Sequence, residues 1–413
     1  MVALLYVHDE VRVVIQRKEY IDRIMQVSDT PVVKIITGIR RSGKSFLLRQ
    51  IQDELKANGV QSSSIVYMNF ESLIYEPYLH YRALYDRVMS ETAGSKSRVY
   101  LFFDEIQDVK EWEKAIRSFM VDLDCDIYIT GSNANLLSSE FATFLAGRYL
   151  ELHLYPLSYR EFLIFSGLPI ESNVKNFQEY LKYGGFPGIH QMTEDENTRY
   201  DYIKGIFNTV ILKDVVQRNK IRDTDLLERV LYFVMDNLGS IISAKKIADF
   251  LKSQGRKMST ETIYVYLRAL ESALVIYKAR RFDIRGKRIL ETQEKYYLAD
   301  LGLKHATLGF RDATIPGLLE NIVYLELKRR GFEVYVGKND LFEVDFVAER
   351  KDERLYIQVA YLLSSEKTID REYRALSSIP DHYPKLVVSM DPFHSASSNG
   401  VRWLNLEHYL LNL

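Results

Sequence analysis

The feature that most constrains this chain is the stretch at residues 38–45, which reads G-x-x-x-x-G-K-S. A β-branched stretch at 32–36 precedes it and a helical pattern at 46–51 follows it, which is the strand–loop–helix context of a phosphate-binding loop. Glycines let backbone N–H groups converge on an anion, and the N-terminus of the following helix adds partial positive charge. The sequence therefore predicts nucleoside triphosphate binding, but it leaves open what the energy is used for.

Each polar side chain of this loop has an expected partner. Lys44 is expected to reach the β- and γ-phosphates, and the Ser45 hydroxyl is expected to hold Mg²⁺. Arg40 and Arg41 either touch phosphate or face a partner, and the pattern does not choose between the two. ATP and Mg²⁺ are the expected cofactors. The expected nucleotide-binding residues are Gly38, Arg40, Arg41, Ser42, Gly43, Lys44, Ser45 and Phe46.

Length and composition place this loop in a larger globular protein. The 413 residues predict roughly two to four domains, and a hydrophobic content of 47% allows large cores. A formal net charge of -1 excludes a chain that is basic throughout, although it allows a basic patch that is balanced elsewhere. The single cysteine, Cys125, excludes a disulfide framework, and no apolar run approaches the roughly 18 residues of a membrane span. We therefore expect a cytoplasmic protein without a membrane partner.

The second strong signal is an apolar run at 99–103 that is followed directly by Asp104 and Glu105. A buried strand would deliver both acids to its C-terminal end, where open α/β sheets bind their ligands. Asp104 is expected to join Ser45 in holding Mg²⁺, and Glu105 is expected to orient or polarise the attacking water. Because binding alone needs only the first acid, the pair predicts hydrolysis. The alternative is a strand that happens to end in surface acids.

Two further segments supply candidate catalytic residues. Ser132 and Asn133 follow a predicted strand at 126–131, so either side chain would contact the γ-phosphate or the water as a sensor, unless the turn is an ordinary helix cap. Arg148 precedes a predicted strand at 149–154. Its guanidinium would neutralise charge on the transferring phosphoryl group, often from a neighbouring subunit, and the alternative is a surface salt bridge. A shared arginine predicts a homo-oligomer. The candidate catalytic residues are Glu105, Arg148, Ser132 and Asn133.

The strings GIRRSGKS at 38–45, DEIQ at 104–107, GSN at 131–133, GR at 147–148 and PLSYREFL at 156–163 together resemble a prokaryotic family of AAA-type P-loop ATPases. In that family the P-loop domain is followed by a winged helix and by a restriction-endonuclease-like domain of unknown function (the DUF4143 type). The resemblance covers nearly the whole chain. It implies ATP hydrolysis and the residue roles given above, and it implies much less about biological purpose.

The order of patterns predicts an α/β protein of several parts. From 32 to about 154, strands alternate with helical patterns, which predicts a mostly parallel and covered sheet. The predicted strands are 32–37, 64–70, 99–103, 126–131 and 149–154. The predicted parts are an AAA-type P-loop ATPase core at 1–155, a helical lid at 156–230, a winged helix-turn-helix at 231–300 and a PD-(D/E)xK nuclease-like α/β domain at 301–413.

The stretch at 231–300 predicts a nucleic-acid contact. Its pattern is helix, turn, helix, strand, basic loop and strand, with Ser243 and either Ser259 or Thr260 as helix caps. Residues 243–295 hold 13 lysines and arginines against 6 acids, an excess of seven positive charges, so the remainder carries -8. That asymmetry favours nucleic acid, and DNA is the expected partner. The alternative is a winged helix used for subunit packing. The candidate DNA contacts are Lys245, Lys246, Tyr264, Arg268, Arg285, Lys287 and Arg288.

The C-terminal region predicts a nuclease-like fold with decayed chemistry. A PD-(D/E)xK nuclease needs an acid, then an acid and a lysine on the adjacent strand, to bind Mg²⁺ and position water. Glu320 and Asp345 stand where the first acids are expected, but Gln358 and Ala360 stand where the later acid and the lysine belong. Glu320, Asp345 and Gln358 are therefore the candidate degenerate nuclease site, and cleavage is not expected.

The expected function is Mg²⁺-dependent ATP hydrolysis by an oligomeric AAA-type ATPase that binds DNA through its winged helix and C-terminal domain. The first alternative is an ATP-dependent regulatory switch that binds a protein partner. The second is an ATP-dependent nuclease. Stimulation of ATP turnover by DNA distinguishes the main hypothesis from the switch, and plasmid cleavage with Mg²⁺ or Mn²⁺ tests the nuclease.

Overall fold

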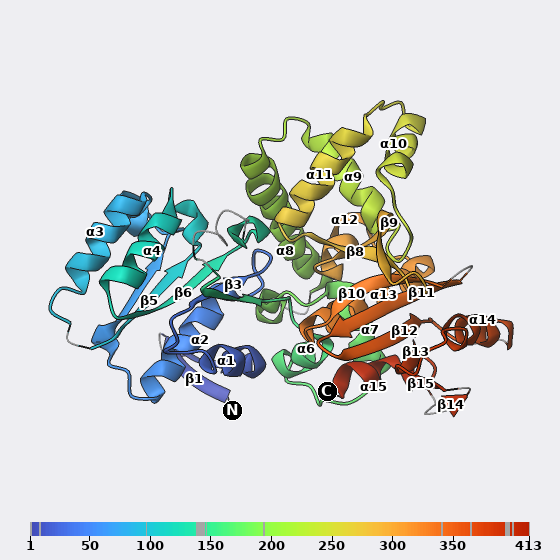
Figure 1. The fold of residues 1–413 in the computed structure, drawn as a ribbon, viewed down its shortest axis with the longest axis horizontal. Helices are drawn as coiled ribbons and strands as arrows, with labels where there is room; N and C mark the ends of the chain where they lie inside the picture. The colour runs from blue at the N-terminus through green and yellow to red at the C-terminus, as the bar shows by residue number, and fades with distance from the viewer. Residues whose placement is uncertain are drawn as a thin grey trace. The chain divides into compact units, whose positions relative to one another are not determined.

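The chain divides into two units, Met1–Leu154 and Tyr155–Leu413, in the computed structural model (Figure 1). The structure describes residues 2–412 except 8–9, 96, 138–144, 146, 193–194, 340–341, 364–365, 393–396 and 399. The predicted division of the chain into four parts is finer than this division into two, and it stays a prediction.

The first unit is built on a five-stranded sheet in the order β4-β5-β6-β3-β7, and all neighbouring strands are parallel. Its strands are β3 (Val33–Thr37), β4 (Ile65–Asn69), β5 (Val99–Asp104), β6 (Cys125–Gly131) and β7 (Tyr149–His153). They confirm the five predicted strands. Every residue of β3 and β5 is buried, as expected for parallel strands that are covered on both faces.

Helices cover both faces of this sheet (Figure 1). Alternate residues of each strand point to opposite faces, so Phe102 packs with α1 (Lys18–Met25) and α2 (Lys44–Ala57) while Leu101 faces the other way. The second face is covered by α3 (Tyr81–Glu91) and α4 (Trp112–Asp122). A separate hairpin precedes these elements and consists of β1 (Val2–Val7) and β2 (Glu10–Ile15).

The second unit contains an eight-stranded mixed sheet in the order β14-β15-β13-β12-β11-β10-β8-β9. Its strands are β8 (Ile276–Asp283), β9 (Arg288–Leu298), β10 (Glu333–Asn339), β11 (Phe342–Arg350), β12 (Glu353–Val359), β13 (Lys385–Ser389), β14 (Ser397–Ser398) and β15 (Val401–Asn405). One face packs on α14 (Glu366–Ser377) through a core that includes Val344, Tyr356, Leu376 and Val387. This sheet positions the predicted nuclease-like residues.

The remaining helices of the second unit precede or flank this sheet. They are α6 (Tyr159–Phe165), α7 (Val174–Tyr183), α8 (Glu196–Thr209), a π-helical segment (Val210–Gln217), α9 (Thr224–Asp236), α10 (Ala244–Ser253), α11 (Thr260–Ser272), α12 (Leu301–Leu308), α13 (Ile315–Arg329) and α15 (Leu406–Leu411). A capping box between Ser158 and Glu161 starts α6. None of the helices described has both the length and the apolar character that crossing a bilayer requires.

The basic stretch has the predicted order of elements and one pairing that the sequence did not predict. Ser243 and Ser259 cap α10 and α11, because each side chain accepts a hydrogen bond from the backbone N–H three residues later. The strands β8 and β9 form the expected antiparallel hairpin. However, β8 also pairs in parallel with β10, so this hairpin is the edge of the eight-stranded sheet. Phe282 and Ile284 hold it there by packing into the core of that sheet.

Candidate functional site

The predicted phosphate-binding loop connects β3 to α2, and its backbone depends on glycine. A Cβ atom built on Gly38 would lie 2.3 Å from the backbone oxygen of Leu154, so no larger residue fits without moving the backbone. Gly43 precedes α2 with a φ of 102°, a left-handed conformation that glycine adopts readily. The loop therefore closes tightly on the N-terminus of α2, which attracts anions.

Lys44 directs its buried ammonium group back over this loop. Its Nζ atom donates to the carbonyl oxygens of Gly38 (3.1 Å) and Ile39 (3.5 Å) and lies 3.3 Å from Glu105 Oε1. The Ser42 hydroxyl is fully buried in the same loop and has no hydrogen-bond partner among the described residues. A buried hydroxyl without a partner and a cation at a helix N-terminus fit the phosphates of a nucleotide.

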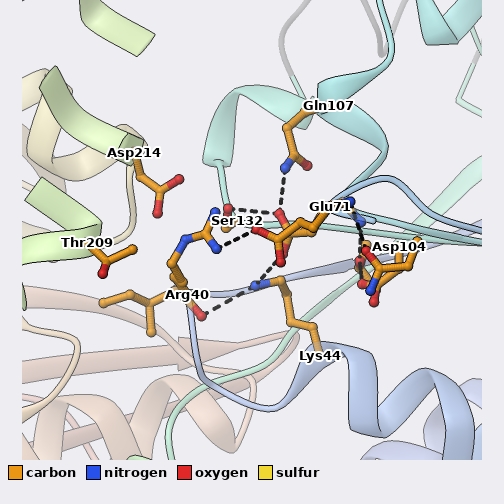
Figure 2. Close-up of polar contacts among 12 residues, drawn as sticks. Arg40, Lys44, Glu71, Asp104, Gln107, Ser132, Thr209 and Asp214 are labelled. Atoms are coloured by element: carbon orange, nitrogen blue, oxygen red, sulfur yellow. Dashed lines mark hydrogen bonds and ion pairs between the residues drawn. The ribbon is translucent and has the colours of Figure 1, made fainter. Parts of the chain in front are cut away.

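Glu105 follows β5 directly, in a left-handed conformation with a φ of 55°. Its Oε2 atom accepts hydrogen bonds from Ser132 Oγ (3.0 Å) and Gln107 Nε2 (2.5 Å), and Figure 2 shows Lys44, Gln107 and Ser132 converging from three elements. Burial would raise the pKa of Glu105, but the Lys44 charge, these hydrogen bonds and Arg40 hold the pKa at about 2. The carboxylate is therefore ionised at neutral pH and serves as a hydrogen-bond acceptor.

Asp104 is fully buried at the end of β5, beside the Glu105 backbone. Its Oδ1 accepts from Thr130 Oγ1 (2.5 Å) and its Oδ2 accepts from the Tyr67 hydroxyl (3.1 Å). Burial and the neighbouring Asp104 charge raise the pKa of Tyr67 to about 12, so this hydroxyl keeps its proton. A carboxylate oxygen on β5 and the Ser45 hydroxyl in the first turn of α2 are the donor types that Mg²⁺ accepts.

The other loop residues divide into buried and exposed. Arg40 is buried, and its guanidinium donates to Glu71 Oε1 at 2.6 Å. Arg41 is exposed, and the Phe46 ring has 55% of its surface exposed. The structure therefore brings Lys44, Asp104, Glu105 and Ser132 together, whereas Arg40 already has a carboxylate partner.

Arg148 lies at the opposite edge of the sheet from the loop. Its backbone oxygen accepts from Val33 N at the start of β3, whereas the loop follows the end of that strand. Since β3 and β7 are parallel and a strand rises about 3.3 Å per residue, Arg148 is separated from the loop by about 15 Å along the strand. An arginine side chain does not span that distance, so Arg148 does not reach the loop of its own chain.

The predicted DNA contacts share one property, which is exposure to solvent. They lie on α10 and α11 and around the turn between β8 and β9, and all seven are exposed: Lys245, Lys246, Tyr264, Arg268, Arg285, Lys287 and Arg288. On α11, Tyr264, Val265 and Arg268 follow a helical spacing that places them on one face. The side chains of Tyr264 and Val265 are 42% and 53% exposed.

The predicted nuclease-like residues also meet, although they come from three elements. Glu320 lies on α13, Asp345 on β11 and Gln358 on β12. Asp345 Oδ2 accepts from Val359 N (2.9 Å), and Gln358 Oε1 accepts from Asp345 N (3.3 Å). Burial raises the pKa values of Glu320 and Asp345, and the nearby Lys295 charge opposes this rise at both carboxylates. Within the described parts of the chain, no three His, Cys, Asp or Glu side chains are arranged to hold a metal ion.

Comparisons with known proteins agree with the geometry of the first unit. The family described as an AAA domain matches residues 30–163, and a domain of unknown function, DUF8612, matches residues 174–314. An uncharacterized protein of Haemophilus influenzae is 39% identical over 402 residues, which cover 97% of this chain and 99% of that protein. The chain belongs to an AAA-type ATPase family. An uncharacterized protein of Methanocaldococcus jannaschii is 33% identical over 376 residues, covering 87% of this chain and 81% of its own length.

The fold of the chain resembles that of a solved Walker-type ATPase of Pyrococcus abyssi. The two chains are 14% identical with a TM-score of 0.50, and the match covers 71% of this chain and 95% of that chain. Such a likeness concerns the fold. The family matched in the middle of the chain is DUF8612, so the expected match to the DUF4143 type stays a prediction, as do the winged helix and the nuclease-like domain.

Sequence reasoning missed two residues of the second unit. Lys295 on β9 lies between Glu320 and Asp345, and Glu343 on β11 lies beside it. Glu343 precedes Asp345 by two residues, so the period of a strand would have placed both on one face. Lys295 had no comparable signal, because it stands at the start of an apolar run on a strand distant in sequence.

Proposed function

We propose that this AAA-type ATPase hydrolyses ATP with Mg²⁺ at residues 38–45, assembles into an oligomer and binds DNA through α10, α11 and the β8–β9 turn. The observation that carries the proposal is the cluster of Lys44, Glu105 and Ser132 beside the buried Asp104. These residues gather where β3, β5 and β6 end, at the edge where parallel sheets bind ligands.

The pairing of Lys44 with Glu105 suggests how nucleotide binding prepares hydrolysis. A triphosphate competes for the Lys44 ammonium, and this leaves Glu105 Oε1 free to accept a hydrogen bond from the attacking water. Gln107 and Ser132 keep Oε2 in place meanwhile. In this proposal the role of Glu105 is to orient the attacking water. Asp104 and Ser45 would hold Mg²⁺, which neutralises phosphate charge.

An oligomer is proposed because Arg148 cannot serve the site of its own subunit. If the exposed Arg148 contacts a phosphate, that phosphate is held by a neighbouring copy. An arginine supplied from a neighbour stabilises charge on the transferring phosphoryl group. The alternative is a surface arginine with no role in the reaction.

DNA is the proposed partner because all seven candidate contacts on α10, α11 and the β8–β9 turn are exposed, and six of them are cations. Each cation that neutralises a phosphate releases a counterion, so affinity would fall as salt rises. The exposed Tyr264 and Val265 on α11 favour the alternative, an ATP-dependent switch whose α11 contacts a protein.

ATP turnover measured with duplex, single-stranded and branched DNA, at low salt, tests the proposal. The expected result is basal turnover that at least one DNA raises. No turnover under any condition would refute hydrolysis, whereas turnover that no DNA changes would favour the protein switch.

A further inference from the structure

A lysine occupies the point where the acids of the nuclease-like region converge. The side chain of Lys295 on β9 is 1% exposed, and its Nζ atom lies 2.8 Å from Glu320 Oε1, 2.8 Å from Glu343 Oε1 and 3.3 Å from Asp345 Oδ1. The Tyr297 hydroxyl, two residues along the same strand, donates to Glu320 Oε1 at 2.5 Å. One ammonium group is therefore shared by three carboxylates that come from α13 and β11.

Oxygen atoms converging from several carboxylates are what a hard divalent cation requires. Here the ammonium of Lys295 already lies among them, and a metal ion would have to approach a buried positive charge. Lys295 is carried by a strand that is paired with β8 along its length, so the ammonium cannot diffuse away. A group tethered in this way competes at an effective concentration of about millimolar or more.

The surroundings retain negative charge even with the lysine in place. Glu320, Glu343 and Asp345 line a cavity of about 600 Å³, together with the buried Glu372 and its partner Arg371. Gln358 lines the same cavity and stands at the position where a nuclease would have an acidic metal ligand. Its amide oxygen accepts a hydrogen bond from Asp345 N. Such a wall repels the phosphate groups of a nucleic acid unless a metal ion bridges the two.

We propose that Lys295 is a built-in counter-ion that takes the place of a divalent metal between Glu320, Glu343 and Asp345, and that removing its ammonium opens a divalent-cation site. The second unit then has no metal-dependent cleavage, and its acidic cavity does not accept a phosphodiester. This inference is independent of the ATPase site in the first unit.

Mn²⁺ binding to the full chain without nucleotide, measured by electron paramagnetic resonance, tests the inference. Lys295→Met is expected to gain one Mn²⁺ site that is on the order of tenfold or more tighter than any site in the wild type. The double variant Lys295→Met/Asp345→Asn is expected to lose that site again, which locates it. Lys351→Met, which removes an exposed lysine elsewhere in the second unit, is the matched control and should bind Mn²⁺ as the wild type does.

A measurement on the wild type keeps the test decisive if Lys295→Met does not fold. The nitrogen-15 signal of the Lys295 ammonium, assigned with Lys295→Arg, is expected to stay sharp as Mn²⁺ is added. Selective broadening of that signal would mean that the metal enters beside the lysine, and it would overturn the inference. A folded Lys295→Met that gains no site would overturn it too, as would plasmid cleavage by the wild type that Asp345→Asn abolishes.

Discussion

The Lys44 ammonium lies 3.3 Å from Glu105 Oε1, and both side chains are almost completely buried. The cation expected to bind phosphate and the acid expected to direct water are thus each other's partners. In the proposed function, a triphosphate that draws the Lys44 ammonium away from Glu105 would link nucleotide binding to the orientation of water.

Glu105→Gln should separate ATP binding from ATP hydrolysis. An amide keeps the size of the side chain but lacks the charge that orients water, so turnover should fall about 100-fold or more while ATP still binds. Turnover and the binding of a fluorescent ATP analogue are the two measurements. Glu76→Gln, the same change at an exposed position of the first unit, is the control. Unchanged turnover in Glu105→Gln would show that the proposed mechanism is wrong.

Arg148→Ala should lower ATP turnover at the site of the neighbouring subunit and not at the site of its own chain. The expected loss is on the order of 10³-fold, because the guanidinium would stabilise charge on the transferring phosphoryl group. Mixing Arg148→Ala with Lys44→Ala should restore part of the activity, since some interfaces then combine an intact loop with an intact arginine. Arg23→Ala, at another exposed arginine of the first unit, should remain active. If mixing two inactive variants restores nothing, Arg148 does not act between subunits.

Removing exposed cations from the basic stretch should weaken DNA binding in a salt-dependent way. For Arg268→Ala/Lys287→Ala, the slope of log affinity against log salt should become shallower by about 0.9 for each DNA phosphate that is no longer neutralised. Fluorescence anisotropy with labelled duplex, at several salt concentrations, gives the slope for each protein. The matched control is Lys351→Ala/Arg402→Ala, which removes an exposed lysine and an exposed arginine elsewhere in the second unit. Equal slopes for the wild type and both variants would argue against this DNA-binding surface.

The second unit should lose stability in mild acid through His305 on α12. Burial lowers the pKa of His305 to about 4 from the ordinary 6.5, although its Nδ1 lies 3.1 Å from the Lys182 carbonyl oxygen. Between pH 6.5 and pH 4 the unfolded chain binds a proton that the folded chain does not, so the free energy of unfolding falls as pH falls. Asp300, whose pKa burial raises from 3.8 to about 7, contributes the opposite slope throughout this range.

His305→Asn removes one titration and leaves that of Asp300, so the variant should lose less stability than the wild type between about pH 7 and pH 5. Urea unfolding at both pH values gives the two differences. His382→Asn, at an exposed histidine of the same unit, should behave like the wild type. An identical decrease in wild type and His305→Asn would contradict the assignment to His305.

The sequence predicted the parts that depend on local patterns. Spacing and residue type along a short stretch determine such features. They predicted the loop at 38–45, the strand that ends in Asp104 and Glu105, and the caps of α10 and α11. The convergence of Asp104 and Ser132 was also predictable, since parallel strands that alternate with helices bring their C-terminal ends to one edge.

Tertiary structure decided which residues from distant segments of the chain lie close together. The sequence by itself determined that this chain has a P-loop motif, two acids at a strand end and a basic region. Only the fold showed that Arg148, just before β7, lies at the end of the sheet away from the loop, that β8 joins β10, and that Lys295 lies among three carboxylates. The physical reason is that strand pairing and burial join residues remote in sequence. A lysine or arginine therefore takes its role from the charges that the fold brings within a few ångströms of it.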